Sequence, residues 1–212
     1  IRIASDLVDE CLIDSKTDLK RIDADSLSQL LTPVFDPKEK DRLRKEGKLL
    51  TKGLNAGPGA ATGLIALTAE QAEKMAQEGP VVLVRVETSP EDISGMVASQ
   101  GILTARGGMT SHAAVVARGM GKPCVCGASA VQIDQAKGIV KVGDRELKAG
   151  QDWISMDGST GEVFVGKLSA HPSEVNQVLV DGRLKAEDSE LYQRFAKIMV
   201  WSREAKRLKV RT

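Results

Sequence analysis

Residues 101–121 read GILTARGGMTSHAAVVARGMG. The first four residues are typical of a short buried strand, and the small and apolar residues over 111–118 are typical of a packed helix. Between them, Gly107 and Gly108 allow the backbone to turn sharply and allow a phosphate to approach it closely. The stretch therefore predicts a strand, a glycine turn and a helix, with Thr110 as the N-cap of the helix.

His112 falls in the first turn of this predicted helix. Free N–H groups at a helix N-terminus can bind phosphoryl oxygens, and the positive end of the helix dipole disfavours a second proton on the imidazole ring. A neutral ring keeps a nucleophilic nitrogen, which can form a covalent phosphoryl intermediate. The pattern alone is equally compatible with an ordinary packed histidine. The second histidine, His171, precedes a proline in a polar segment and is interpreted as structural.

The composition argues against several functional classes. A formal net charge of +1 provides no positive excess for nucleic acid or an anionic membrane, and 3% aromatic residues leave few stacking surfaces for bases. Apolar runs are too short to span a bilayer, and the first residues show no signal-peptide pattern. The chain lacks an initiator Met, so we expect a piece of a longer protein.

The cysteines indicate a reducing compartment, and we expect a cytoplasmic location. There are only three, Cys11, Cys124 and Cys126, which is too sparse and uneven for a disulfide framework. The pair Cys124-Val125-Cys126 would supply only half of a zinc site. We interpret it as part of a buried strand, and we predict no metal site within this chain.

The chain divides into three predicted segments. Residues 1–50 are expected to be helical, including a helix that Asp36-Pro37 would cap and start. Residues 51–168 alternate strands and helices after a loop crowded with glycines, which indicates an α/β layered domain with mixed strands. Residues 169–212 are expected to form mostly one helix. Strands are predicted at 81–87, 101–104, 123–126, 139–142, 153–156 and 162–165, and helices at 68–77, from 89 onward and at 111–118.

The motif from Gly107 to Gly121 resembles the phosphohistidine signature of the pyruvate, phosphate dikinase family. Phosphoenolpyruvate synthases and enzyme I of the sugar phosphotransferase system share the glycine turn and the histidine, but usually carry Arg where this chain has Met109. Cys126 stands where many relatives have Ser. The resemblance covers nearly the whole chain, with further matches at 29–37, 53–63, 84–92, 157–162 and 210–212.

The resemblance implies a swivelling β/β/α phosphohistidine domain flanked by helical linkers. Residues 1–50 would lead from an ATP-grasp domain, 51–168 would be the mobile domain, and 169–212 would lead to a barrel that binds phosphoenolpyruvate or pyruvate. His112 would be phosphorylated from ATP and phosphate and would pass the group to pyruvate. Mg²⁺ would be bound by the other domains. This part alone would not complete the reaction; we expect it to be a monomer and the full enzyme a homodimer.

The site roles follow from the same motif. His112 would be the nucleophile, and Gly107, Gly108, Thr110 and Ser111 would shape the phosphate site. Arg106 would either neutralise phosphate charge or remain a solvated loop arginine. Thr110 matches the threonine that a bifunctional kinase/phosphatase modifies in dikinases, where a second phosphate beside the nucleophile would repel the incoming one. Two alternatives remain open: the carrier of a phosphoenolpyruvate synthase or of enzyme I, and a docking module without chemistry.

Overall fold

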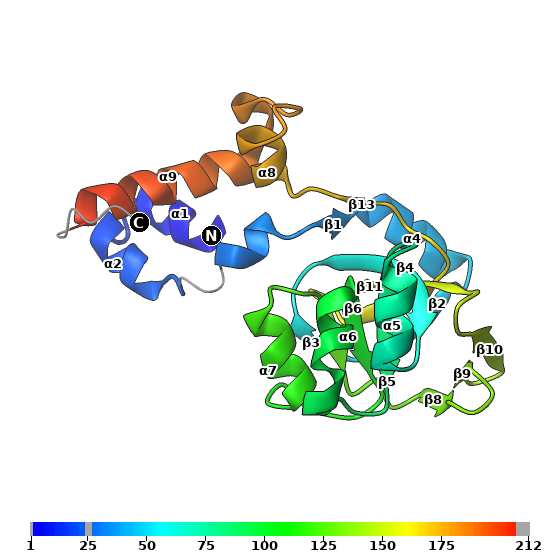
Figure 1. Cartoon of the computed structure of the whole chain (residues 1–212). Coiled ribbons are helices and arrows are strands. Elements are labelled where there is room, and N and C mark those ends of the chain that lie inside the picture. Colours follow the sequence, from blue (N-terminus) through cyan, green and yellow to red (C-terminus); the bar gives the residue numbers. More distant parts are fainter. Residues whose placement is uncertain (1, 24–26, 207–212) are drawn as a thin grey trace. The chain divides into compact units, whose positions relative to one another are not determined.

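The computed structural model describes residues 2–23 and 27–206, and it divides into two compact units (Figure 1). One unit comprises Pro33–His171 and the other combines Ile1–Thr32 with Pro172–Thr212. We call them the sheet unit and the helical unit. The proposed carrier motif lies in the sheet unit, and each unit is described by itself.

An eight-stranded mixed sheet forms the centre of the sheet unit. Its four middle strands, β4 to β7, run parallel in chain order. Each pair that involves an outer strand is antiparallel. This mixed α/β arrangement confirms the predicted fold class. The order across the sheet is β2 (Leu49–Lys52), β12 (Glu162–Val165), β11 (Trp153–Asp157), β4 (Ala60–Ala66), β5 (Val81–Arg85), β6 (Gly101–Thr104), β7 (Cys124–Cys126) and β3 (Leu54–Gly57).

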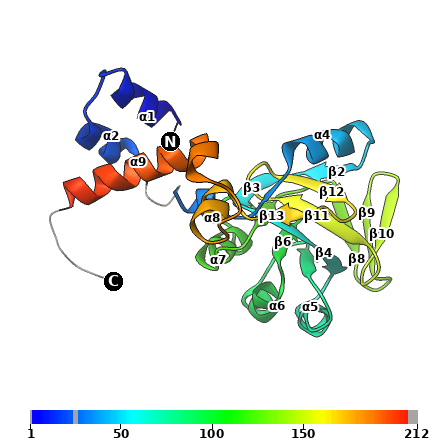
Figure 2. The same cartoon turned by 90° about the horizontal axis from the view of Figure 1, so that it is seen from above.

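Three helices cover one face of this sheet and a small sheet covers the other. Helices α5 (Ala69–Ala76), α6 (Ile93–Ala98) and α7 (His112–Gly119) connect successive parallel strands, with α5 and α6 packed together (Figure 2). Because side chains alternate across a strand, neighbouring residues enter different cores. Thus Leu83 packs with the helices, whereas Val82 packs toward the small sheet. That sheet has the order β10 (Arg145–Lys148), β9 (Ile139–Val142) and β8 (Val131–Asp134), and it completes the β/β/α layers.

The glycine-crowded stretch after residue 52 forms strands β3 and β4 rather than the predicted loop. At Gly63, a Cβ atom would lie 2.6 Å from the backbone carbon of Val81. Glycine is therefore used here for close strand packing, because no side chain would fit between the two strands. A sequence pattern cannot separate this use of glycine from a turn, which explains the missed strands.

The sheet unit begins at Pro33, before the predicted domain start at residue 51. Helix α4 (Pro37–Lys45) starts as predicted, with Asp36 accepting a hydrogen bond from the N–H of Lys38 at 2.8 Å. The resemblance placed this helix in a linker, yet Leu43 packs in the cluster that contains Phe164 of β12. The unit is closed by the antiparallel pair β1 (Val34–Phe35) and β13 (Ala170–His171).

In the helical unit, the longest described helix is α9 (Glu190–Ala205). It contacts α1 (Arg2–Asp9), α2 (Ser15–Arg21) and α8 (Glu174–Leu179). Arg194 of α9 joins the two chain segments through an ion pair of 2.5 Å with Asp6 and a hydrogen bond of 2.6 Å to Ser5. The segment 169–212 was predicted to form mostly one helix, but it contains several separate elements. The elements are α1 (Arg2–Asp9), α2 (Ser15–Arg21), η1 (Ser28–Leu31), α8 (Glu174–Leu179), η3 (Ala186–Asp188) and α9 (Glu190–Ala205).

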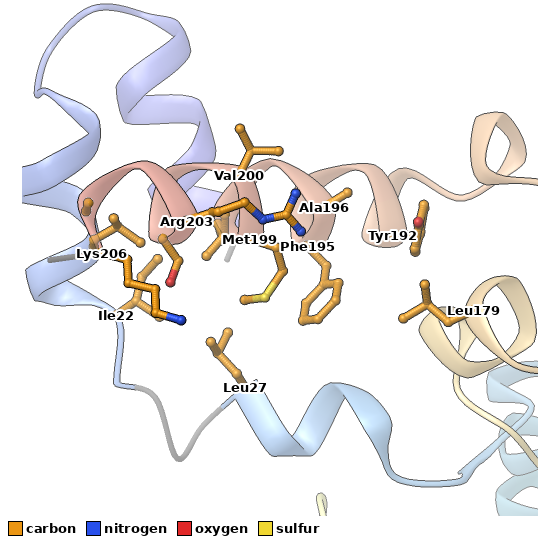
Figure 3. Close-up of a pocket in the computed structure, with 14 residues that line it drawn as sticks. Ile22, Leu27, Leu179, Tyr192, Phe195, Ala196, Met199, Val200, Arg203 and Lys206 are labelled. Carbon is orange, nitrogen blue, oxygen red and sulfur yellow. The ribbon is translucent and has the colours of Figure 1, made fainter. Parts of the chain in front are cut away.

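One side of α9 borders an apolar groove within the helical unit. Ile22, Leu27, Phe195 and Met199 are among the side chains that line it (Figure 3). In the described part of the chain, no helix combines the length and the apolar character that crossing a bilayer requires. The predicted stretch 210–212 lies outside the described residues.

Candidate active site

His112 is the first residue of α7, and Ser111 is its N-cap. The Oγ of Ser111 accepts a hydrogen bond from the N–H of Ala114 at 3.4 Å, whereas Thr110 is exposed and precedes the cap. The predicted N-cap, Thr110, is therefore wrong by one residue. The reason is a turn that precedes the helix. The N–H of Ser111 donates to the carbonyl of Gly108 at 3.0 Å, so Thr110 lies inside this turn and the helix starts one residue later.

The glycine turn has two different roles at its two positions. Gly107 has a φ of +106°, and a Cβ atom there would come within 3.0 Å of the Ser111 side chain. Only glycine satisfies both constraints without strain. At Gly108, by contrast, a Cβ atom would meet no heavy atom within 4 Å. The turn is thus tight at Gly107 and open at Gly108, one face of which remains accessible to a ligand.

The imidazole of His112 is half-buried, and its Nδ1 lies 3.0 Å from the Oγ1 of Thr88. Thr88 follows β5, and its loop is fixed on both sides. The N–H of Arg106 donates to the carbonyl of Val86 at 2.9 Å, and the N–H of Ser89 donates to Asp92 at 2.9 Å. Thr88 is therefore held in place by backbone anchors immediately around it.

Asp92 itself is anchored in turn. Its buried carboxylate forms an ion pair of 3.1 Å with Nε of Arg85, at the end of β5. The guanidinium of Arg85 also donates to the carbonyl of Leu67 at 2.9 Å. The loop that presents Thr88 is thus tied to the sheet through a charged pair.

Thr88 was not among the predicted site residues. The missed signal was topological, because β5 and β6 are adjacent parallel strands and their carboxyl ends meet at one edge of the sheet. The loops that follow these strands carry Thr88 and His112. A sequence reading that paired the two strands would have brought both residues together.

Arg118 is a second residue that the sequence analysis did not single out for the site. Its Nε donates to the carbonyl of Ala114 at 3.1 Å, and its Nη2 donates to the carbonyl of Met109. It therefore ties the turn before His112 to the helix after it. Arg106, predicted near the phosphate, is exposed and lies directly before Gly107.

The contact with Thr88 makes the two ring nitrogens of His112 chemically different. When Nδ1 carries the hydrogen and donates it to the threonine hydroxyl, Nε2 retains its lone pair. That tautomer is suited to nucleophilic attack on phosphorus. A hydroxyl can accept this hydrogen bond without itself becoming charged.

The described residues contain no group of three or more His, Cys, Asp or Glu side chains placed to hold a metal ion. Cys124 and Cys126 lie in the buried strand β7, as predicted, and both are free thiols.

Residues 77–161 match the family described as PEP-utilising enzyme, mobile domain. The matched stretch includes His112 and the glycine turn before it. The chain is 46% identical over 212 residues to a chloroplastic pyruvate, phosphate dikinase of Flaveria bidentis, covering 99% of this chain and 20% of the relative. It is 44% identical over 213 residues to the pyruvate, phosphate dikinase of Clostridium symbiosum, covering 100% of this chain and 22% of that relative. These findings confirm the resemblance seen in the motif.

The chain spans about a fifth of the length of the curated relatives that it matches. Among solved structures, a solution structure of an enzyme I protein is similar with 23% identity and a TM-score of 0.30, over 58% of this chain and 38% of that one.

Proposed function

We propose that this chain is the phosphoryl-carrier part of a pyruvate, phosphate dikinase, with Nε2 of His112 as the nucleophile. The observation that supports it most directly is the 3.0 Å contact between Nδ1 of His112 and the hydroxyl of Thr88. It directs Nδ1 away from substrate and leaves Nε2 to react. Similarity to dikinases along the full length of the chain supports the same assignment.

The proposed reaction has two reversible steps. In the first, Nε2 forms a bond to a phosphorus of the donor derived from ATP and phosphate, while the P–O bond from that phosphorus to its leaving group breaks. ATP and phosphate end as phosphohistidine, AMP and pyrophosphate. In the second, the enolate oxygen of pyruvate attacks that phosphorus and the N–P bond breaks, which yields phosphoenolpyruvate and restores the lone pair. The Nδ1 proton stays on the ring throughout, bound to Thr88. The positive end of α7 stabilises the charge of the attached phosphoryl group.

Residues of the turn support the phosphoryl group in this proposal. Gly107 and Gly108 allow its close approach, Ser111 starts the helix, and Arg106 supplies positive charge from an exposed position. The exposed hydroxyl of Thr110 is the site that a regulatory kinase/phosphatase would modify. A phosphate there would stand two residues from His112 and would repel the incoming group.

The remaining parts of the proposed enzyme lie outside this chain. An ATP-grasp domain would donate the phosphoryl group, a barrel would bind pyruvate or phosphoenolpyruvate, and Mg²⁺ would be held by those domains. The segments 1–50 and 169–212 would act as linkers on either side of the mobile domain. The full enzyme would be a cytoplasmic homodimer, and the chain alone a monomer.

The carrier role is tested by intact-mass measurement after incubation with the nucleotide-binding region of the Clostridium symbiosum dikinase, ATP, phosphate and Mg²⁺. Phosphoramidate serves as a second, small-molecule donor that needs no docking. We expect one acid-labile phosphoryl group, absent in His112→Ala and retained in His171→Ala, which removes the exposed histidine of β13. A folded chain that gains no labile phosphate from either donor would contradict the proposal.

The acceptor is tested separately. Phosphorylated chain is mixed with the pyruvate-binding region of the same dikinase and pyruvate, and phosphoenolpyruvate is measured. Transfer to pyruvate supports the dikinase assignment. Stable phosphohistidine that pyruvate does not discharge would instead favour a carrier that serves another acceptor.

A further inference from the structure

The two thiols of β7 contact both sequence neighbours of His112. The hydroxyl of Ser111 donates to Sγ of Cys126 at 3.7 Å, and Sγ of Cys124 lies 3.9 Å from the carbonyl oxygen of Ala113. Residues two apart in a strand point to the same face, so both sulfurs face α7. They lie 3.5 Å from each other. The sulfur pair therefore sits directly behind the first turn that carries the nucleophile.

We propose that Cys124 and Cys126 form a dithiol switch that a hydroperoxide oxidises to a disulfide, which displaces His112 and suppresses phosphoryl uptake. This inference rests on the proposed carrier function for its effect on transfer. The formation of the disulfide does not depend on that function.

The hydrogen bonds around Cys126 favour its reactive form. The thiol of Cys124 donates to it and lowers its pKa to about 6, with further hydrogen bonds from Thr104 and Ser111, although burial acts in the opposite direction. The same interaction raises the pKa of Cys124, which keeps its proton as the donor. A thiolate beside a thiol is the arrangement that peroxide attacks and a second sulfur resolves.

The glycine turn controls the access to this buried pair. The backbone of Gly107 lies against the residue that follows Cys126, since a Cβ atom on Gly127 would come within 2.8 Å of the Gly107 carbonyl. Cys126 itself is fully buried. Oxidation therefore requires the turn over β7 to open, and the turn is the same segment that would receive the phosphoryl group.

The chemistry balances with one hydroperoxide per pair. The Cys126 thiolate attacks one oxygen of H₂O₂, so that the O–O bond breaks, a sulfenic acid forms and hydroxide leaves and is protonated to water. The sulfur of Cys124 then attacks the Cys126 sulfur, its thiol proton leaves with the hydroxyl group as a second water, and the disulfide forms. Two thiols lose two electrons, and the peroxide gains them.

Closing the disulfide has a direct structural cost at the site. A sulfur–sulfur bond is about 2.05 Å long, so the two atoms must approach by about 1.5 Å from their 3.5 Å separation. Cys124 also loses the S–H group that donates to Cys126, and its sulfur, 3.9 Å from the Ala113 carbonyl, moves relative to the first turn of α7. Because a misplacement of about 1 Å at a reacting group lowers rates by up to about a hundredfold, we expect uptake to fall at least about tenfold.

The test uses the chain with Cys11→Ser, which removes its exposed thiol and leaves the pair intact. Samples are titrated with H₂O₂ and analysed by intact mass, by peptide mapping, by phosphoryl uptake from phosphoramidate and by the ring-nitrogen NMR signals of His112. We expect the mass to fall by two hydrogens, the peptide map to show a Cys124–Cys126 linkage and the His112 signals to shift. Phosphoryl uptake should fall on oxidation and recover when dithiothreitol is added. In Cys126→Ser, which keeps a hydroxyl beside Ser111, uptake should resist peroxide.

Three results would overturn the switch. They are an absence of the intramolecular linkage, oxygen addition to Cys126 without closure, and a linked protein whose uptake and His112 signals equal those of the reduced form. Failure of the carrier function looks different. In that case the reduced chain takes up no phosphate, while the linkage still forms and still shifts the His112 signals.

Discussion

The His112 site and the charged cluster beneath α4 both bring polar side chains together in the sheet unit. They differ in how many hydrogen-bonding groups of these side chains already have a partner. In the cluster, Nζ of Lys40 lies 2.5 Å from Asp157 and 3.6 Å from Glu162, and Arg44 binds both oxygens of Glu162 at 2.9 and 2.8 Å. Lys40 and both acids are buried. His112 is half-buried, and within the described residues its side chain has one hydrogen bond, to Thr88.

The difference separates an anchor from a side chain with an unused nitrogen. Buried charges are tolerated where each one is paired, and the cluster uses its hydrogen bonds and ion pairs to hold α4 on the turn between β11 and β12. At His112, the contact with Thr88 engages one ring nitrogen, and in the proposed function the other nitrogen binds the phosphoryl group. On that proposal, an oriented and incompletely bonded side chain marks the site, and a density of charge does not.

The largest expected effect is on the anchor. Lys40→Met keeps the apolar stem but leaves Asp157 buried without its cation, so we expect the free energy of unfolding to fall by about 3–5 kcal/mol. Urea denaturation measures this change. Phosphoryl uptake per folded molecule should stay at the parent level, because among residues 2–23 and 27–206 the hydrogen bond of the His112 side chain goes to Thr88 and not to the cluster.

The double variant Lys40→Met with Asp157→Asn is the control for that prediction. It removes both charges and preserves an oxygen for the N–H groups of Ser159 and Thr160, which Asp157 accepts at 2.9 and 3.2 Å. Stability should recover by more than half of the loss. A double variant as unstable as Lys40→Met would show that the cluster does not act through charge pairing.

The next largest effect concerns the contact between Thr88 and His112. Thr88→Val removes the hydroxyl without changing the size of the side chain, so Nδ1 of His112 loses its partner and the ring loses its fixed tautomer. We expect phosphoryl uptake from phosphoramidate to fall about tenfold to a hundredfold, with little change in stability. Thr88→Ser, which keeps the hydroxyl, should retain most of the uptake.

Nitrogen NMR of His112 identifies the cause of that loss. The parent chain should show hydrogen on Nδ1, and Thr88→Val should show a mixture of both tautomers. Equal uptake in Thr88→Val and the parent would remove the central support for the carrier proposal and would make the Thr88 contact merely structural.

A smaller effect distinguishes the two candidate N-caps of α7. Ser111→Ala should lower the free energy of unfolding by about 1 kcal/mol, because the N–H of Ala114 loses its acceptor. Thr110→Ala should change it by less than about 0.5 kcal/mol, as expected for an exposed residue. Thermal unfolding of the two variants in parallel provides the measurement, and the reverse ranking would restore Thr110 as the cap.

The last prediction concerns acid stability. Burial alone would raise the pKa of Glu162, but hydrogen bonds from Arg44 and Thr160 outweigh it and leave the pKa below the ordinary value of 4.5. The carboxylate therefore stabilises the fold at pH values above about 4.5, and this contribution is lost as the pH falls through the lower folded value. Glu162→Gln should unfold with a weaker dependence on pH in that acid range, and an unchanged acid limb would contradict the assignment.

Local patterns predicted the elements whose geometry depends on adjacent residues. The strand, turn and helix from 101 to 119 follow from the glycines and from the apolar period, and the cap at Asp36 follows from its own side chain. The choice between Thr110 and Ser111 failed, because either hydroxyl can cap a helix and the backbone turn at Gly108 decides between them.

By itself, the sequence determined where the proposed nucleophile, His112, stands: at the start of a helix, after a turn that requires glycine. The tertiary structure alone decided what orients it and what anchors the domain around it. Thr88 is 24 residues from His112, and Lys40 is 117 residues from Asp157. Such partners meet only because the sheet places distant loops at one edge, and no local pattern encodes the strand order that brings them together.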